Sequence, residues 1–218
     1  MSDSIHVPTT TFDQVIADHL REKTLGDLDN ATRHFDPMDK SVILVDGPNF
    51  YGTIKALGLS VDYAKFFDYF RKITRVASIN YFTAVSDDPI HAPLKDMLTW
   101  MRSNGIRVHT RDSVKGMVRD QVTGEEKVLW SGNMDAEIIV CALEECRRAD
   151  HIILVSGDGD FVPMVKACQR RGQKFTVVSS HTTKPSYLSR DLANTTDGYI
   201  NLEHLEPYIQ WNPGLSKG

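Results

Sequence analysis

The chain has 218 residues, of which 41% are apolar and 25% charged, a composition that excludes disordered and fibrous proteins. Its formal net charge of −4 sets it apart from strongly basic nucleic-acid-binding proteins, although a carboxylate cluster neutralised by metal would carry much of that charge. There is no run of about 18 apolar residues for a membrane span, no signal peptide pattern and no CxxC pair among three cysteines. We therefore expect a cytoplasmic protein that does not enter the membrane.

Residues 1–40 differ in pattern from the rest of the chain. Apolar residues at helical spacing predict one amphipathic helix from Phe12 to Leu28, and a polar stretch ending in Asp36-Pro37 follows it. We interpret this region as an N-terminal helical extension. Its helix either packs against the main domain or binds a partner, including a second copy of the chain.

From residue 41 to 205 short β-branched runs alternate with longer helical patterns, which is typical of a parallel sheet flanked by helices. The predicted strands cover residues 41–46, 78–84, 106–111, 151–157, 174–180 and 198–202. The predicted helices cover residues 62–74, 91–104, 135–148 and 161–171, and Gly105 and Gly172 lie at two of their ends. The pattern predicts a doubly wound α/β domain with a mostly parallel sheet, followed by a C-terminal tail at 206–218.

One segment interrupts this alternation. Residues 115–130 contain two short alternating runs on either side of the turn signal Thr123-Gly124. This arrangement predicts a β-hairpin inserted into the domain. It would either contact nucleic acid or have no direct functional role.

Acidic residues lie where a doubly wound sheet places its ligands. Asp46 ends the first predicted strand, Asp158 and Asp160 follow the fourth, and Asp135 begins the helix between the third and fourth. Ligands of such sheets bind beyond the carboxyl ends of the strands, commonly between the first and fourth. Carboxylates packed there would repel one another unless a hard cation such as Mg²⁺ or Mn²⁺ bound them. Such a site is suited to phosphodiester hydrolysis, and Gly47, Gly157 and Gly159 would allow close approach of a phosphate.

Each aspartate has a simpler explanation when taken alone. An aspartate at a strand end often caps a helix or shapes a turn, and Asp160 directly precedes a predicted helix. The coincidence of several acidic segments at one edge favours the metal site. Two sets of basic residues either follow an RNA backbone or are merely solvated: Lys115, Arg119 and Lys127 in the hairpin, and Lys166, Arg170 and Arg171 after the fourth strand. The eight histidines show no zinc-binding spacing, and no phosphate-binding loop follows a strand.

Four segments together carry a resemblance to a known family. They are VDGPNF (45–50), MDAEIIVCAL (134–143), SGDGDFVPMVKACQRRGQKFTVV (156–178) and LANTTDGYINL (192–202). In this order they resemble the NYN domain of the LabA-like family, which is related to the PIN nucleases. The resemblance implies a PIN-like fold and a metal-dependent ribonuclease whose acidic residues match Asp46, Asp135, Asp158 and Asp160, with Asn49 supporting the site.

The sequence departs from the family pattern at two positions. Gly132 stands where members often carry lysine, and Cys141 stands where they often carry another acidic residue. The leading hypothesis is an endoribonuclease that acts on RNA with Mg²⁺ or Mn²⁺. These departures favour a second hypothesis, a catalytically weak RNA-binding or regulatory adaptor. A phosphatase is a third, but Gly47-Pro48 after Asp46 removes the Asp-x-Asp nucleophile motif.

Overall fold

The computed structural model describes residues 32–119 and 126–211, and it contains a six-stranded sheet with the order β3-β2-β1-β6-β7-β8. All neighbouring strands in this sheet run parallel. Its strands are β1 (Lys40–Asp46), β2 (Arg75–Val85), β3 (Arg107–Asp112), β6 (His151–Val155), β7 (Lys174–Ser179) and β8 (Gly198–Asn201). The predicted parallel, doubly wound α/β fold is confirmed.

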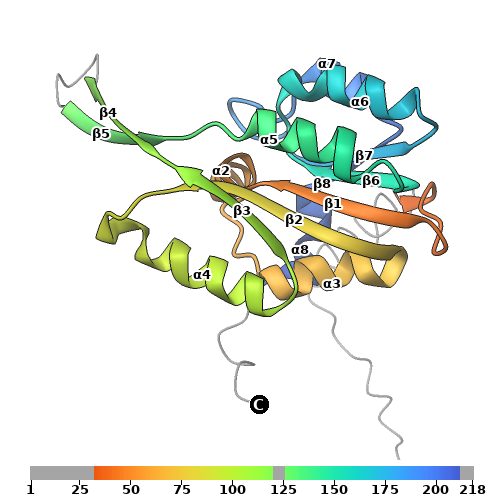
Figure 1. Ribbon diagram of the computed structural model, residues 1–218, viewed down its shortest axis with the longest axis horizontal. Coiled ribbons are helices and arrows are strands. Elements are labelled where there is room, and N and C mark those ends of the chain that lie inside the picture. The colour runs from red at the N-terminus through yellow and green to blue at the C-terminus, as the bar shows by residue number, and fades with distance from the viewer. Residues whose placement is uncertain (1–31, 120–125, 212–218) are drawn as a thin grey trace, which may run out of the picture.

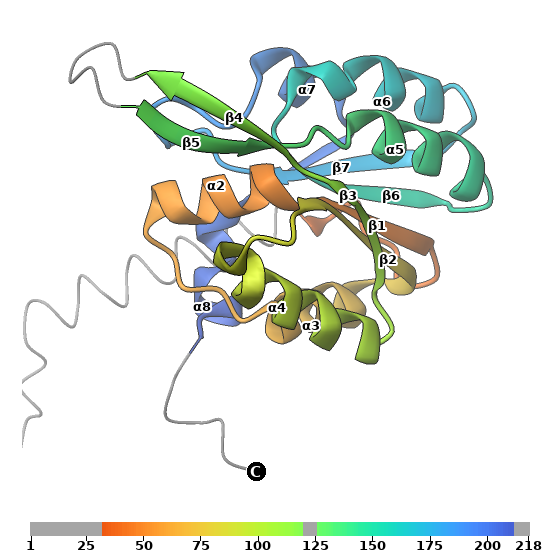
Figure 2. The same ribbon diagram turned by 60° about the vertical axis from the view of Figure 1, so that its left-hand side comes forward.

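Helices cover both faces of the sheet (Figure 1). One face carries α5 (Asp135–Val140), α6 (Val162–Gln169) and α7 (Arg190–Thr195), and the other carries α3 (Tyr63–Ile73), α4 (Ala92–Ser103) and α8 (Glu206–Ile209). The remaining helix, α2 (Gly47–Leu57), leaves the carboxyl end of β1 directly (Figure 2). Four short helical turns cover Pro89–His91, Cys141–Glu145, Gly159–Phe161 and Leu202–Leu205.

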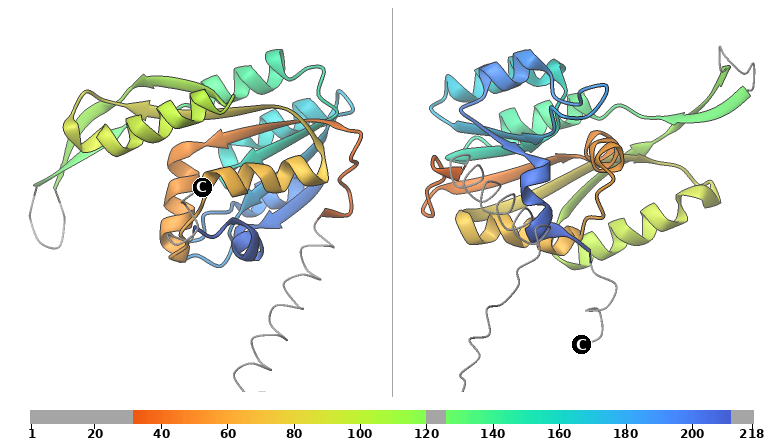
Figure 3. Two further views of the ribbon diagram at one scale, coloured as in Figure 1. Left: turned by 90° about the horizontal axis from the view of Figure 1, so that it is seen from below. Right: turned by 180° about the vertical axis from the view of Figure 1, so that it is seen from behind.

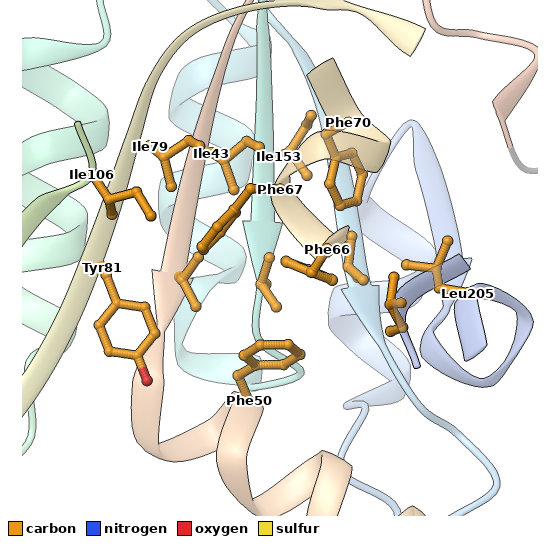
Figure 4. Packing of buried hydrophobic residues seen from close by; sticks show 14 of the residues in the cluster. Ile43, Phe50, Phe66, Phe67, Phe70, Ile79, Tyr81, Ile106, Ile153 and Leu205 are labelled. Carbon is orange, nitrogen blue, oxygen red and sulfur yellow. The ribbon is translucent and has the colours of Figure 1, made fainter. Parts of the chain in front are cut away.

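Each face of the sheet has its own apolar core. The core under α3 and α4 contains tilted and edge-on aromatic rings, and Figure 4 shows Phe50, Phe66, Phe67 and Phe70 packed on the isoleucines of the central strands. The core under α5 to α7 is mostly aliphatic and holds all three cysteines. Strands buried on both faces explain why the sequence shows continuous apolar runs rather than alternation.

The C-terminal helix also belongs to the packed structure. Ile209 in α8 is buried in the aromatic core, and its carbonyl oxygen accepts a hydrogen bond from the backbone N–H of Asp62 at 2.7 Å. Residues up to Trp211 therefore pack against the start of α3, beyond the predicted domain limit of 205.

The predicted hairpin is present as β4 (Val114–Arg119) and β5 (Glu126–Ser131), which pair antiparallel and extend away from the main sheet (Figure 3). Its predicted turn, Thr123-Gly124, and the predicted helix from Phe12 to Leu28 lie outside the described residues. No helix among the described residues is long and apolar enough to cross a membrane.

Three helices, α2, α7 and α8, are absent from the sequence prediction, although Pro48 in the first turn of α2 is a typical helix start signal. In addition, the predicted helix at 135–148 is α-helical only to Val140. A π turn follows, because the N–H of Cys146 bonds to the carbonyl oxygen of Cys141 five residues earlier at 3.0 Å.

Candidate metal centre

The acidic residues gather at the carboxyl edge of the sheet, where β1 and β6 lie side by side. From these two strands the chain departs in opposite directions, toward β2 on one side and β7 on the other. Asp46 is the last residue of β1, and the segment from Ser156 to Asp160 follows β6. The structure thus has its topological switch point between the first and fourth strands of the sheet, as expected.

Three carboxylates form the cluster itself. One carboxylate oxygen from each of Asp135, Asp158 and Asp160 lies within 4.8 Å of the others. Asp135 and Asp158 are half-buried, and Asp160 is exposed. Among the described residues no other group of three histidine, cysteine or acidic side chains comes this close together. The cluster presents hard oxygen atoms only, as Mg²⁺ and Mn²⁺ prefer.

Local hydrogen bonds fix the direction of two of these side chains. The Asn133 side-chain amide donates to Asp135 Oδ2 at 2.6 Å, and its carbonyl oxygen accepts from the Asp135 N–H at 2.6 Å. Asp158 accepts a bond from the N–H of Asp160 at 2.9 Å and so caps the short turn at Gly159–Phe161. The structure gives the Asp160 side chain no capping bond to the turn or to α6. Capping thus explains Asp158 in part but not Asp160.

Asp46 lies behind the cluster instead of within it. The residue is 8% exposed. Its Oδ2 accepts a bond from the Ser156 hydroxyl at 2.9 Å, and its Oδ1 accepts a long bond of 3.4 Å from the N–H of Asn49. The Ser156 oxygen in turn accepts from the N–H of Asp158 at 3.2 Å. The structure therefore brings three of the four predicted ligands together and links the fourth to them through Ser156.

Asn49 connects the two strand ends. Its side-chain carbonyl oxygen accepts a hydrogen bond from the N–H of Gly157 at 3.1 Å, so the first turn of α2 holds the segment after β6. A β-carbon at Gly157 would lie 1.9 Å from the carbonyl oxygen of Tyr187. The lack of a side chain at Gly157 therefore allows the 180–189 loop to pack against the backbone at this position. The sequence-based prediction gave Gly157 a different role, the close approach of a phosphate.

The electrostatic environment of the carboxylates favours a bound cation. Burial raises the pKa of Asp46 to about 6; the hydrogen bonds from Ser156 and Asn49 oppose this increase, and Asp135 and Asp158 add to it. Burial also raises the pKa of Asp135, and the charges of Asp158 and Asp160 contribute. A divalent cation between these groups would offset both burial and repulsion.

Several functional contacts were not predicted from the sequence. No role was predicted for Ser156 from the sequence, although its place between a strand and two aspartates is a usable signal. Arg111 at the end of β3 donates to the carbonyl oxygen of Asn133 at 2.7 Å and lies 3.4 Å from a carboxylate oxygen of Glu137. It therefore holds the start of α5 against the sheet edge, a contact between distant segments that no local pattern indicates.

The two departures from the family pattern have structural explanations. A β-carbon at Gly132 would lie 2.2 Å from the β-carbon of Ala84, so any side chain there would require the backbone to move. Cys141 is buried in the aliphatic core, with its sulfur 4.0 Å from that of Cys146. The cysteine therefore packs in the core, and the carboxylate cluster consists of other residues.

The basic residues expected to follow RNA are not gathered at the cluster. Lys166 and Arg170 lie in the second half of α6 and just after it, about 6–12 Å along the helix from its start near Asp160, given a rise of 1.5 Å per residue. Arg171 donates to the carbonyl oxygen of Leu143 at 2.6 Å. Lys115 on β4 is exposed, while the side chains of Arg119 and Lys127 lie outside the described part of the structure.

Comparison with known proteins agrees with the fold. The chain matches the NYN domain over residues 40–203. It is 26% identical over 170 residues to the low amplitude and bright protein LabA of Synechococcus elongatus, covering 77% of this chain and 86% of that protein. The crystal structure of a protein of unknown function from Vibrio parahaemolyticus matches with 26% identity and a TM-score of 0.61, over 80% of this chain and 98% of the other. The chain therefore belongs to the NYN domain family, with a PIN-like α/β fold and a LabA-like relationship.

Proposed function

We propose that this protein is a metal-dependent endoribonuclease that hydrolyses RNA phosphodiester bonds at the acidic centre. The observation that carries the proposal is the convergence of Asp135, Asp158 and Asp160 within 4.8 Å at the switch point of the sheet. Three carboxylates without a neutralising partner would repel one another, and none of the ion pairs of the described residues includes them. A divalent cation fits this donor set, and the NYN family relationship favours RNA as the substrate.

In this proposal Asp135, Asp158 and Asp160 hold the Mg²⁺ or Mn²⁺, and Asp46 supports them from behind. A bound divalent cation would lower the pKa of an attacking water molecule and stabilise the leaving oxygen. The chain contributes positioning: Asn133 orients Asp135, and Ser156 joins Asp46 to the backbone of Asp158. Asn49 holds the segment after β6 against the first turn of α2 through its hydrogen bond with the N–H of Gly157.

The protonation of Asp46 provides a further link to metal. With a pKa of about 6, this buried carboxylate binds a proton in mildly acidic solution, and positive charge nearby would lower that pKa again. We propose that Asp46 is protonated below about pH 6 in the metal-free protein and stays ionised to lower pH when a cation is present. It would then contribute negative charge to the site without direct contact.

A second candidate is a catalytically weak RNA-binding or regulatory adaptor. The observation that favours it is the small number of converging ligands, because Asp46 is held by Ser156 and position 141 is a buried cysteine. Such a protein would bind RNA at the same edge of the sheet without cutting it.

Incubation of the purified full chain with a labelled mixed-sequence RNA separates the two functions. With millimolar Mn²⁺ or Mg²⁺ we expect cleavage within the RNA, and with EDTA none. Asp160→Asn should abolish cutting, whereas Asp96→Asn, at an exposed position of α4 on the opposite face of the sheet, should leave it unchanged. Binding without cutting under all conditions would favour the adaptor.

A further inference from the structure

A cavity of about 410 Å³ lies beside the acidic centre, between α5 and the edge of the sheet. The sheet contributes Phe82 and His109, and the helix side contributes Ala136, Glu137, Val140, Cys141 and Glu145. Its volume is within the range of small-molecule sites and exceeds what one nucleobase requires. Nothing in the proposed reaction uses this cavity.

Strand register fixes the position of the cavity relative to the acidic centre. Asp46 on β1 pairs with Phe82 on β2, which pairs with His109 on β3. Neighbouring strands are about 4.8 Å apart, so the backbone of His109 lies roughly 10 Å from that of Asp46 along one row. Asp135 begins the helix that forms the other wall of the cavity. An RNA strand with one phosphate at the acidic centre can therefore place a neighbouring base in the cavity.

One wall of the cavity is a flat aromatic surface. The rings of His109 and Phe82 are stacked, with centroids 4.5 Å apart and planes 9° from parallel. The His109 ring is also fixed by a 3.2 Å hydrogen bond between its Nε2 and the side-chain oxygen of Asn80. Burial lowers the pKa of His109; the charge of Glu145 opposes this decrease and that of Arg107 adds to it, and the net direction favours the neutral ring. A preformed neutral aromatic wall suits the face or edge of a nucleobase.

Apart from the His109 ring, the polar side chains that line the cavity are carboxylates, which accept hydrogen bonds and carry negative charge. Glu137 and Glu145 line it, and no lysine or arginine does. One carboxylate oxygen of Glu137 lies near Arg111, but its Oε2 has no hydrogen-bond partner among the described residues. Glu145 forms no ion pair with the described residues and is exposed. Such a lining repels phosphate and favours a neutral ligand that carries N–H donors.

We propose that this cavity binds one base of the RNA and prefers guanine, with Glu145 accepting its two adjacent N–H donors. This inference rests on the proposed function for the placement of the RNA strand. Guanine offers N1–H and the N2 amino group side by side on its Watson–Crick edge, matching the two oxygens of a carboxylate. Inosine lacks the amino group, uracil has a single imino donor, and adenine has only its amino donor on that edge. The cavity would therefore set sequence preference beside the cleaved bond.

Equilibrium binding tests this assignment without relying on cleavage. Four labelled nonamers of uridine carry guanine, hypoxanthine (as inosine), adenine or uracil at the centre, and their affinities for the Asp158→Asn protein are measured by fluorescence anisotropy in millimolar Mg²⁺ and in EDTA. We expect the guanine nonamer to bind about tenfold more tightly than the other three, the usual effect of one charge-assisted hydrogen bond. Val140→Trp, at a 58% exposed position on the rim, should fill the cavity and reduce the preference below twofold.

Glu145→Gln should also reduce the guanine preference below twofold while leaving the affinity for the all-uridine nonamer unchanged. The matched control is Glu144→Gln, because Glu144 is also exposed but does not line the cavity. Equal affinities for all four nonamers, a preference that survives Val140→Trp, or no RNA binding would overturn the proposal. A further outcome would also overturn it: a hexa-arginine peptide binds, Glu145→Gln weakens this binding, and RNA does not displace the peptide. That result would assign the cavity to a basic protein partner. A guanine preference without metal-dependent cleavage would support the cavity and reject the nuclease.

Discussion

The Ser156 hydroxyl donates a 2.9 Å hydrogen bond to Asp46 Oδ2 and accepts one from the backbone N–H of Asp158. One small side chain thus joins the end of β1 to the turn that carries two aspartates of the cluster. The bond stabilises the ionised form of Asp46, yet burial still raises the pKa of this carboxyl group to about 6. The remaining cost of burying the charge should be measurable in the metal-free protein.

We expect Asp46→Asn to be more stable than wild type at pH 7.5 in EDTA. The wild-type carboxyl binds a proton more tightly when folded, so its contribution to stability falls as pH rises from 3.8 to about 6. The full difference is about 3 kcal/mol at 1.36 kcal/mol per pKa unit, and it should disappear near pH 4. Urea denaturation between pH 4 and 8 measures it. A variant less stable than wild type at pH 7.5 would show that Asp46 serves mainly as the cap of α2.

Metal should stabilise the folded protein through the three-carboxylate cluster. At a hundredfold excess over its dissociation constant, a cation that binds only the folded state adds about 2.7 kcal/mol to the free energy of unfolding. For a chain of this size, the melting temperature should rise by roughly 5–10 °C with millimolar Mn²⁺ or Mg²⁺. Thermal melts of wild type, Asp160→Asn and Asp96→Asn provide the measurement.

Asp160→Asn should lose most of this increase, because Asp160 contributes a ligand but no capping bond. Asp96→Asn should retain it, since this residue is exposed on α4 at the opposite face. General screening of a protein with net charge −4 would affect both variants alike. Equal shifts in the two variants would therefore contradict a specific site.

The six sheet strands and their parallel direction were predictable from local patterns, because strands buried on both faces need continuous apolar runs. The acidic centre was predictable because a parallel sheet places the carboxyl ends of all its strands at one edge. The sequence did not indicate that three of the aspartates form the cluster while Asp46 lies behind it. Whether Asp46 points into the cluster or toward Ser156 depends on side-chain packing between segments 110 residues apart.

The differences from the prediction at α2 and after Val140 have distinct causes. In α2 the Gly47-Pro48 pair is compatible with a loop and with a first helical turn, and the decisive contact is distant: a β-carbon at position 47 would meet the carbonyl oxygen of Phe82 at 2.7 Å. The π turn after Val140 keeps helical spacing in the sequence and changes only the bonding partner of Cys146. Periodicity alone therefore cannot separate it from an α-helix.

Gly132→Ala tests why lysine is absent from this position. The added β-carbon would lie 2.2 Å from the β-carbon of Ala84, so we expect a loss of about 1–3 kcal/mol in the free energy of unfolding. The double variant Gly132→Ala/Ala84→Gly removes the clash and should recover at least half of that loss relative to Ala84→Gly alone. Urea midpoints of the four proteins form the cycle. Additive effects would show that the two residues do not constrain each other.

His151 is a buried histidine at the amino edge of the sheet, away from the acidic centre. Its side chain is fully buried, its Nε2 lies 2.7 Å from the Thr176 hydroxyl, and its Nδ1 has no partner among the described residues. Burial lowers the pKa of His151 to about 4, and His34 and Lys174 lower it further, while Asp39 and Asp197 oppose them. The folded state therefore requires the neutral ring.

The folded protein should consequently lose stability as pH falls from 6.5 toward 4, because the unfolded chain binds a proton that the folded chain excludes. The expected loss is about 3 kcal/mol from the shift of this one group. Protonation of Asp46 stabilises the folded state over part of this pH range and would offset the loss, so the measurement is made in the Asp46→Asn background.

His151→Gln keeps an amide that can bond to Thr176 but cannot be protonated, and its stability to urea should fall less between pH 7 and 4.5. His181→Gln, at an exposed position, should follow the parent protein. If His151→Gln and the parent lose stability in parallel, the acid sensitivity arises elsewhere, and His151 accepts its proton without cost.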